Sequence, residues 1–181
     1  IKSPSDAMKL KIAYVPEDRK SLALDLEAKI SNNIAVANMD KLARFGFIQF
    51  AKEKALCETM SEKLRIKTPS IYMEASMLSG GNQQKVVLAK WLAREVDVLI
   101  LDEPTRGIDV GSKEEIHKLI IELAREGLGV ILISSELPEV LGMSDRIVVM
   151  YEGELKAILN ATEANQETIM SYSVDAKAVN N

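Results

Sequence analysis

An apolar segment at residues 96–101 constrains the fold of this chain more than any other part of the sequence. Apart from Asp97, every residue in it is aliphatic. A strand that is buried on both faces of a parallel sheet has this composition. A second aliphatic run lies at residues 130–133, and a helical pattern at residues 112–125 separates the two runs. The order strand, helix, strand predicts an α/β layered core.

The helix at residues 112–125 is the clearest in the sequence. Its apolar residues fall on one helical face, and they are Ile116, Leu119, Ile120 and Leu123. Ser112 and Glu115 have the spacing of a capping box, which predicts that Ser112 begins the helix. Gly127 is expected to end it.

Shorter patterns predict the remaining elements. The predicted strands are residues 11–15, which Pro16 stops, residues 147–150, and residues 155–159, which pair back on them around a turn at residues 152–153. The predicted helices are residues 82–94, 136–141 and 163–170.

The chain is predicted to be a single partial domain with an inserted helical section. Residues 18–69 are rich in Lys, Glu, Ala and Met and favour helix. We therefore expect an α/β core made of residues 1–17 and 96–170, a helical subdomain of residues 18–95, and a tail of residues 171–181.

Composition excludes several classes of protein. The 181 residues are 47% hydrophobic and 28% charged, so the chain can bury a core. A net charge of −4 argues against a nucleic-acid partner. One cysteine and one histidine exclude an internal disulfide and a multi-histidine metal centre. No apolar stretch reaches membrane-spanning length, so we expect a chain that does not cross a bilayer. Together these features fit a soluble protein of a reducing compartment. The start at Ile1 is neither an initiator Met nor a signal peptide, so we expect a chain that is either processed or cut from something longer.

Two carboxylates, Asp102 and Glu103, directly follow the first aliphatic run. Ligands bind at the carboxyl ends of strands in open α/β sheets. Because adjacent residues of a strand point to opposite sides, one carboxylate can hold Mg²⁺ while the other orients an attacking water. These residues alone favour two interpretations equally: a site for metal and water, or two carboxylates that are simply solvated in a loop.

A Ser79-Gly80-Gly81 loop runs directly into the helix predicted after it. Glycines let a backbone approach a ligand closely, and a helix start presents free N–H groups to an anion. By itself this segment favours an ordinary loop with a helix cap, because Ser-Gly-Gly is common.

Together, the two segments resemble the nucleotide-binding domain of ABC transporters. Residues 78–84 (Leu-Ser-Gly-Gly-Asn-Gln-Gln) are similar to the signature loop of that family, and residues 98–105 (Val-Leu-Ile-Leu-Asp-Glu-Pro-Thr) to its Walker B motif. Residues 106–109 fall where the family has its D-loop, residues 14–17 where it has its Q-loop, and residues 133–136 where it has its switch histidine. The resemblance covers nearly the whole chain and implies a P-loop NTPase-like core.

Finer features are similar to one branch, the monosaccharide importers, whose ATPase subunit carries two nucleotide-binding domains in tandem. These features are Pro16-Glu17-Asp18-Arg19-Lys20, Asn82-Gln83-Gln84, residues 105–111 and Ser134-Ser135-Glu136. The chain looks like the second domain of such a subunit, truncated before its own P-loop.

Three departures separate the sequence from the usual family pattern. The 181 residues contain no Gly-Lys dipeptide, so the P-loop that cradles phosphates is absent from them. Glu17 stands where most members have Gln, and Ser135 where most have His. These changes put hydrolysis at this domain's own site in doubt, and we expect the isolated chain to hydrolyse little or no ATP.

The resemblance implies ATP and Mg²⁺ as cofactors and a role for each matching residue. Glu103 and Ser135 are the candidate catalytic residues, Asp102 and Glu17 the candidate metal ligands, and Ser79, Gly80, Gly81, Asn82, Gln83, Glu17 and Asp109 the candidate nucleotide contacts. The implied partners are another nucleotide-binding domain, membrane permease subunits and, indirectly, a periplasmic or extracellular sugar-binding protein. The implied location is peripheral, on the cytoplasmic face of a bacterial inner membrane.

Alternatives remain open at this point. The chain could be a non-catalytic regulatory or structural module, or, less favoured, an ABC ATPase outside transport. Ser135 could be a helix cap and Asp109 a loop cap. His117 is expected on the surface, and Cys57 and Trp91 are expected to pack inside.

Overall fold

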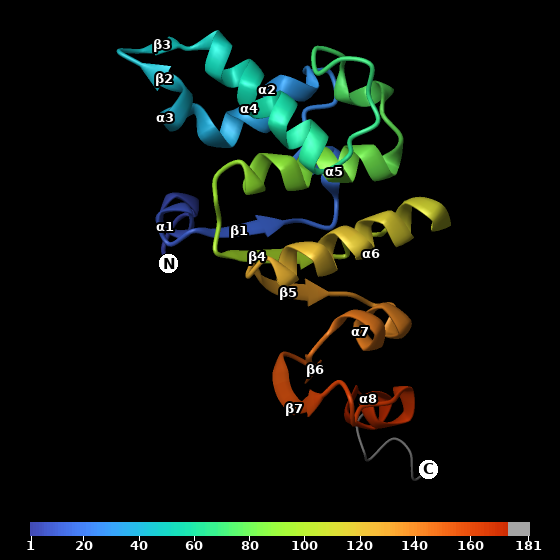
Figure 1. The fold of residues 1–181 in the computed structure, drawn as a ribbon. Helices are drawn as coiled ribbons and strands as arrows, with labels where there is room; N and C mark the ends of the chain where they lie inside the picture. The colour runs from blue at the N-terminus through green and yellow to red at the C-terminus, as the bar shows by residue number, and fades with distance from the viewer. Residues whose placement is uncertain (174–181) are drawn as a thin grey trace. The chain divides into compact units, whose positions relative to one another are not determined.

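The computed structural model describes residues 1–173, and it divides into two compact units, Ile1–Ile131 and Leu132–Asn181 (Figure 1). The helices of the first unit are α1 (Pro4–Lys9), α2 (Ile30–Ala35), α3 (Met39–Leu42), α4 (Phe50–Lys63), α5 (Gly80–Leu92) and α6 (Val110–Arg125). Its strands are β1 (Ile12–Val15), β2 (Ala43–Arg44), β3 (Phe47–Ile48), β4 (Val98–Asp102) and β5 (Gly129–Ile133), the last of which crosses into the second unit. Short helical turns are η1 (Arg19–Ala23), η2 (Val36–Asn38) and η3 (Ala75–Met77).

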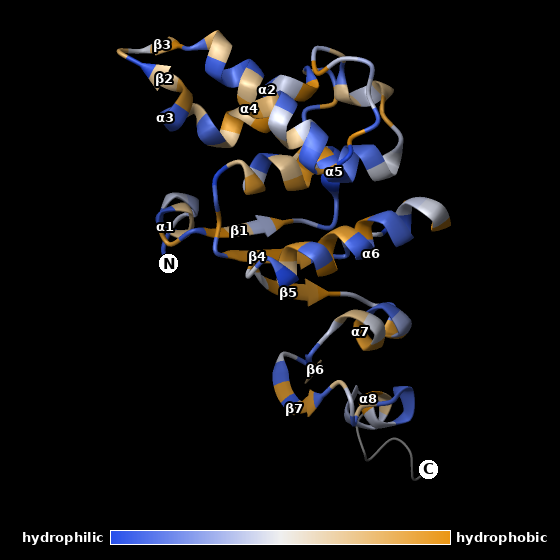
Figure 2. Cartoon of the chain, viewed as in Figure 1, coloured by the Kyte–Doolittle hydropathy of each residue, from blue (hydrophilic) through white to orange (hydrophobic). Residues whose placement is uncertain are grey.

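The strands predicted from the two aliphatic runs, β4 and β5, form one sheet with the strand predicted at residues 11–15, in the order β1, β4, β5. Strands β1 and β4 are parallel, and Val15 lies opposite Leu101. Val15 and Leu101 are fully buried, as is Leu99. In Figure 2, β4 and β5 are coloured as hydrophobic along their lengths. The predicted α/β class is confirmed. Asp102 is the last residue of β4, so it lies at the carboxyl end of the central strand.

Helix α5 is the central element of the first unit. Val86, Val87, Leu88 and Ala89 are consecutive and fully buried. A helix buried on all sides must be surrounded by packing partners, and α5 packs against α2, α4, α6 and β1. The start of this helix is therefore held firmly relative to the sheet.

Residues 18–69, which were predicted to be mostly helical, also contain a β-hairpin. Strands β2 and β3 pair with Arg44 opposite Phe47, which leaves Phe45 and Gly46 as the turn. Both turn residues have positive φ, at 52° and 82°. A two-residue hairpin turn of this kind needs positive φ at both central positions, which Phe45 does not signal in the sequence.

Helix α6 begins earlier than predicted, and its cap is a different residue. Asp109 is the N-cap, and its Oδ1 accepts a hydrogen bond of 2.9 Å from the Ser112 backbone N–H. The predicted capping box of Ser112 and Glu115 is therefore wrong. The predicted apolar face is confirmed, because its four residues are all buried. Gly127 follows the helix with a φ of 100°, as a helix-ending glycine should.

The second unit contains α7 (Leu137–Met143), β6 (Arg146–Tyr151), β7 (Glu154–Asn160) and α8 (Gln166–Ser173). Strands β6 and β7 form an antiparallel two-stranded sheet, which confirms the predicted hairpin. Ile147, Val149 and Ile169 form the core of this unit, with Leu137, Val140, Leu141, Ala157, Leu159, Ala161 and Ala164 packed against them. Helix α8 reaches into the predicted tail, whose residues 174–181 lie outside the described part of the chain.

Residues 18–95 belong to the same compact unit as β1 and β4. A separate helical subdomain at residues 18–95 therefore stays a prediction. Within residues 1–173, none of the helices is both long and apolar enough to span a bilayer.

Candidate functional site

The loop after β4 turns sharply at the edge of the sheet. Asp102 and Glu103 are both partly exposed, whereas Thr105 is almost completely buried. Glu103 has a φ of 45° and Gly107 a φ of 66°. A left-handed conformation costs a residue such as Glu about 1 kcal/mol. Packing of the loop therefore holds Glu103 in a conformation that it would not choose by itself.

Tyr14 in β1 contacts the predicted metal ligand Asp102. The Tyr14 hydroxyl donates a hydrogen bond of 2.7 Å to Oδ2 of Asp102. This hydrogen bond, followed by desolvation and the negative charge of the carboxylate, raises the pKa of Tyr14. Sequence reasoning missed Tyr14 as a site residue, although parallel pairing of the predicted strand at residues 11–15 with the run at residues 96–101 would have placed it near Asp102.

Glu17 and Arg19, which follow β1, both contact the loop after β4. The Glu17 carboxylate forms an ion pair with Arg106. The Arg19 guanidinium donates from Nη1 to the Arg106 carbonyl at 2.8 Å and from Nη2 to the Gly107 carbonyl at 3.2 Å. The structure therefore joins the segments similar to the Q-loop and the D-loop. Arg19 was not among the predicted site residues.

Ser79 is the N-cap of α5. Its hydroxyl oxygen accepts hydrogen bonds from the Asn82 side-chain amide at 2.9 Å and from the Asn82 backbone N–H at 3.5 Å. Gln83 points inward, where its side-chain amide donates to the Ala75 carbonyl at 3.2 Å. Of these predicted nucleotide contacts, Ser79 is exposed and Gln83 is buried.

Both glycines of the signature-like loop lie close to neighbouring segments, and packing against Ser112 requires a glycine at position 81. A Cβ on Gly80 would lie 2.8 Å from Nη2 of Arg19, and a Cβ on Gly81 would lie 2.6 Å from the Cβ of Ser112. Real Cβ atoms essentially never make contacts this short. The glycines thus bring the start of α5 against the segment after β1 and against α6. The sequence had suggested only close approach to a ligand.

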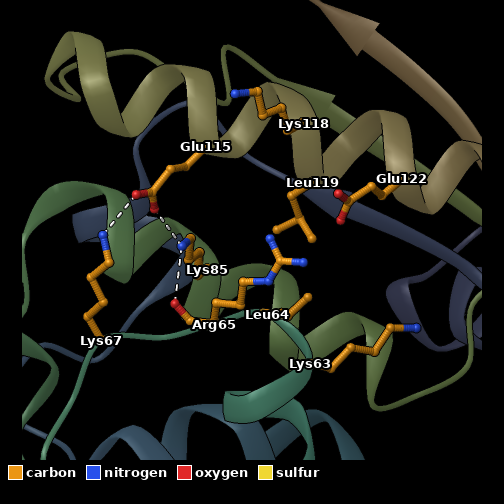
Figure 3. A pocket seen from close by; sticks show the side chains of 9 residues that line it. All are labelled: Lys63, Leu64, Arg65, Lys67, Lys85, Glu115, Lys118, Leu119 and Glu122. Carbon is orange, nitrogen blue, oxygen red and sulfur yellow. Dashed lines mark hydrogen bonds and ion pairs between the residues drawn. The ribbon is translucent and has the colours of Figure 1, made fainter.

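An ion-pair network beside this loop links α5 and α6 (Figure 3). Glu115 accepts hydrogen bonds of 2.8 Å from both Lys67 and Lys85, and Lys85 also donates to the Arg65 carbonyl at 3.2 Å. These contacts, with that from Lys67 the largest, lower the pKa of Glu115 to about 2. The network lines a hollow of about 280 Å³. Asn82 connects this network to the signature-like loop, because Oδ1 of Asn82 accepts a hydrogen bond of 2.8 Å from the backbone N–H of Lys67.

Ser135 belongs to the second unit, between β5 and α7. The Ser134 hydroxyl oxygen accepts a hydrogen bond of 3.0 Å from the Glu136 backbone N–H just before α7.

The number of donor side chains around the carboxylates at the end of β4 decides what kind of metal site they can form. Within residues 1–173, no group of three or more His, Cys, Asp or Glu side chains is placed to hold a metal ion. Protein-bound Mg²⁺ commonly takes one or two carboxylates and completes its shell with phosphate oxygens and water. Asp102 and Glu103 provide that smaller set of donors.

The α/β fold and the family comparison identify the class of protein as an ABC transporter ATP-binding domain. A family model described as ABC transporter matches residues 2–106, and the chain belongs to this family. A ribose import ATP-binding protein, RbsA, of Oceanobacillus iheyensis is 51% identical over 173 residues, which are 96% of this chain and 35% of that protein. RbsA of Halalkalibacterium halodurans is 47% identical over the same shares of both chains. The chain thus spans about a third of the length of these relatives.

Solved structures support the fold. An ATP-binding cassette in a dimeric post-hydrolysis state, bound to ADP and Pi, superimposes with a TM-score of 0.71 at 20% identity and covers 88% of this chain and 68% of its own. The ADP conformation of another ABC transporter cassette gives a TM-score of 0.70 at 22% identity, over 98% of this chain and 70% of its own.

Proposed function

We propose that this chain is part of the ATP-hydrolysing subunit that powers a carbohydrate importer. It contributes its signature loop, Walker B carboxylates and D-loop to a nucleotide sandwiched between two such domains. The relatives that carry the name ribose import ATP-binding protein support the sugar class, because they match 96% of this chain at about half identity.

One side chain, that of Arg19, contacts two segments that are distant in the sequence, and this contact is the main support for the proposed function. The start of α5 and the loop after β4 both lie against Arg19. Ser79 and Asp109 are therefore presented by elements that are fixed to each other. A helix start stabilises an anion, and the neighbouring carboxylates supply Mg²⁺ ligands. The start of α5 therefore suits the phosphates of a nucleotide held by the opposite domain, and the carboxylates after β4 suit the metal at this domain's own site.

Each predicted residue has a proposed role. Ser79, Gly80, Gly81 and Asn82 face the phosphates of a nucleotide held by the opposite domain. Gln83, the remaining predicted contact, belongs to the same helix start, where its buried side chain donates to the Ala75 carbonyl. Asp102 and Glu17 serve the metal, Glu103 orients the attacking water, Ser135 lies near the γ-phosphate, and Asp109 contacts the opposite domain. When bound, Mg²⁺ neutralises phosphate charge.

The proposed partners are a second nucleotide-binding domain, the permease subunits in the membrane and, through them, a sugar-binding protein outside. The proposed place is the cytoplasmic face of the bacterial inner membrane. We also propose that the 181-residue chain hydrolyses little ATP by itself, because it contains no Gly-Lys-Ser/Thr phosphate cradle.

The test uses the full-length protein assembled with its permease in vesicles. Hydrolysis and uptake of labelled ribose and galactose are measured for the parent, for Glu103→Gln and for Glu152→Gln, a control in the turn between β6 and β7. Loss of a water-orienting carboxylate lowers a rate by about 100-fold or more, so we expect this for Glu103→Gln and no change for the control. Uptake that does not depend on ATP contradicts the importer role. Unchanged hydrolysis in Glu103→Gln favours the alternative of a non-catalytic module.

A further inference from the structure

Arg19 is a buried cation that reaches the backbone of a distant loop. It begins η1, and only 7% of its surface is exposed. Its two terminal nitrogens donate to two consecutive carbonyls, those of Arg106 and Gly107. The accepting residues lie 87 and 88 positions further along the chain. The contact is therefore a tertiary link that fixes the loop after β4 just before Asp109.

The same guanidinium also lies against the first residue of α5. Any Cβ on Gly80 would be 2.8 Å from Nη2 of Arg19 and 3.4 Å from the Gly107 carbonyl oxygen. The guanidinium therefore lies beside the start of α5 while it binds the loop carbonyl, and a side chain on Gly80 would have to displace its end. One side chain thus sets the distance between the two segments.

The chemistry of this contact requires arginine. Carbonyl acceptors at two neighbouring residues match the planar fork of a guanidinium, whereas a lysine presents a single nitrogen. Burial lowers the pKa of Arg19, and the charge of Asp18 opposes this. Within residues 1–173, its buried Nε has no hydrogen-bond partner. A buried cation that is held by carbonyls and lacks full hydrogen bonding is costly to keep, so its role is more than filling space.

A second contact from the same segment reinforces the link. Glu17 forms its ion pair with the side chain of Arg106, whose carbonyl Arg19 binds. Residues 17 and 19 therefore hold both the side chain and the backbone of one residue in the loop.

We propose that Arg19 is a positioning residue that fixes the start of α5 and residues 103–109 relative to each other. It thereby sets the spacing of Ser79 and Asp109 toward a nucleotide and the opposite domain. The second statement rests on the proposed function, whereas the first concerns the fold alone. The two are tested by separate measurements.

The first measurement is amide hydrogen exchange in the full-length protein. Arg19→Lys is compared with Lys20→Ala, which changes a neighbouring exposed cation. We expect exchange at least tenfold faster in residues 79–83 and 103–109 of Arg19→Lys, with residues 116–123 unchanged and no effect of Lys20→Ala. Unchanged exchange in both loops overturns the positioning role. Faster exchange spread evenly over the first unit also overturns it, because it would indicate a general loss of stability.

A double-mutant comparison makes the contact with Gly80 specific. Gly80→Ala alone is expected to speed exchange in residues 103–109, because its Cβ displaces the guanidinium. In an Arg19→Ala background the same change should have little further effect, because the atom that it meets is gone. Equal effects of Gly80→Ala in both backgrounds contradict the proposal, and Arg19→Gln replaces Arg19→Ala if the latter does not fold.

Hydrolysis by the assembly with permease tests the link to nucleotide. Arg19→Lys should lower kcat about tenfold and leave KM within twofold, since Arg19 touches the loops and not the nucleotide. If exchange changes as expected and kcat does not, Arg19 positions the loops but their spacing does not serve hydrolysis. If Lys20→Ala lowers kcat equally, the effect is one of surface charge and the assignment to Arg19 is wrong.

Discussion

The hydroxyl of Tyr14 lies 2.7 Å from Oδ2 of Asp102, and the hydrogen bond joins two neighbouring parallel strands at the acidic edge of the sheet. It occupies one oxygen of the carboxylate that we propose as a Mg²⁺ ligand. Tyr14 therefore fixes the orientation of Asp102 from the side of β1.

We expect Tyr14→Phe to destabilise the chain by about 0.5 kcal/mol, because a half-exposed hydrogen bond contributes less than a buried one. Because the folded-state pKa of Tyr14 is raised, this contribution is complete below the unfolded value of about 10 and is lost as the pH rises through the folded value. Urea unfolding from pH 7 to 11, with the phenolate absorbance followed in parallel, measures both effects. Parent and variant curves that stay parallel across this range would contradict the assignment.

Glu115 provides the second prediction, because it neutralises the buried Lys85. The side chain of Lys85 is 6% exposed and that of Glu115 is 44% exposed. Glu115→Gln leaves the Lys85 cation without its carboxylate, and we expect a loss of about 2 kcal/mol, less than for a fully buried pair. Urea unfolding at pH 7 gives the value. The neighbouring Glu114→Gln is the matched control, since its i,i+4 pair with Lys118 is exposed and should contribute nothing measurable.

The low pKa of Glu115 gives this prediction a pH dependence. The folded-state pKa is about 2, against 4.5 for an unperturbed carboxyl. The stability from Glu115 is therefore present above pH 4.5 and is lost as the pH falls toward 2. The difference in unfolding free energy between the parent and Glu115→Gln should shrink over this interval. A constant difference would mean that the ion pairs do not form in solution.

Gly81 provides a steric prediction. Its Cβ would meet the Cβ of Ser112 at 2.6 Å, so Gly81→Ala forces α5 and α6 apart and should cost about 1–3 kcal/mol. Gly142→Ala in α7 is the matched control, because a Cβ there meets nothing within 4 Å. That substitution should stabilise the protein by up to about 1 kcal/mol through helix propensity. Thermal unfolding with calorimetry compares the two, and destabilisation of similar size in both would contradict the contact.

The sequence predicted those elements that local patterns determine. The strands near residues 96–101 and 130–133 follow from aliphatic runs, and the face of α6 follows from helical spacing. The cap of α6 was misplaced by about one turn because Ser112 and Asp109 are both good cap residues, and local sequence does not decide between them.

The missed parts of the site depend on contacts between residues far apart in the sequence. Arg19 and Arg106 are 87 residues apart, and Tyr14 and Asp102 are 88 apart. Neither the spacing of apolar residues nor a sequence motif indicates such long-range side-chain contacts. The resemblance to a family marked the loops that take part but not the side chains that join them.

Cys57 should be unreactive in the folded protein. It is fully buried in α4, and burial, with smaller effects from Glu53 and Glu58, raises the pKa of its thiol to about 12. Since the thiolate is the reactive form, we expect negligible labelling by a thiol reagent at pH 8 and complete labelling in denaturant. Labelling of the folded chain within minutes would contradict the buried position.

Self-association is the last prediction, and it follows from the apolar surface of the sheet. Strand β1 lies at one edge of its sheet, and Tyr14 in that strand is 49% exposed. Ile131 in β5, at the opposite edge, is 52% exposed. Unpaired strand edges and exposed aliphatic side chains favour association. We therefore expect the isolated 181-residue chain to form dimers or larger species in sedimentation velocity at micromolar concentration.

A charge at the exposed position should reverse this association. Ile131→Lys places a cation where the side chain is already half in solvent, so it should disfavour edge pairing without disturbing the buried Leu99 and Leu101 of β4. We expect a shift toward monomer with an unchanged circular dichroism spectrum. If the parent chain sediments as a stable monomer, or if Ile131→Lys associates as strongly as the parent, these strands are not the surface that drives association.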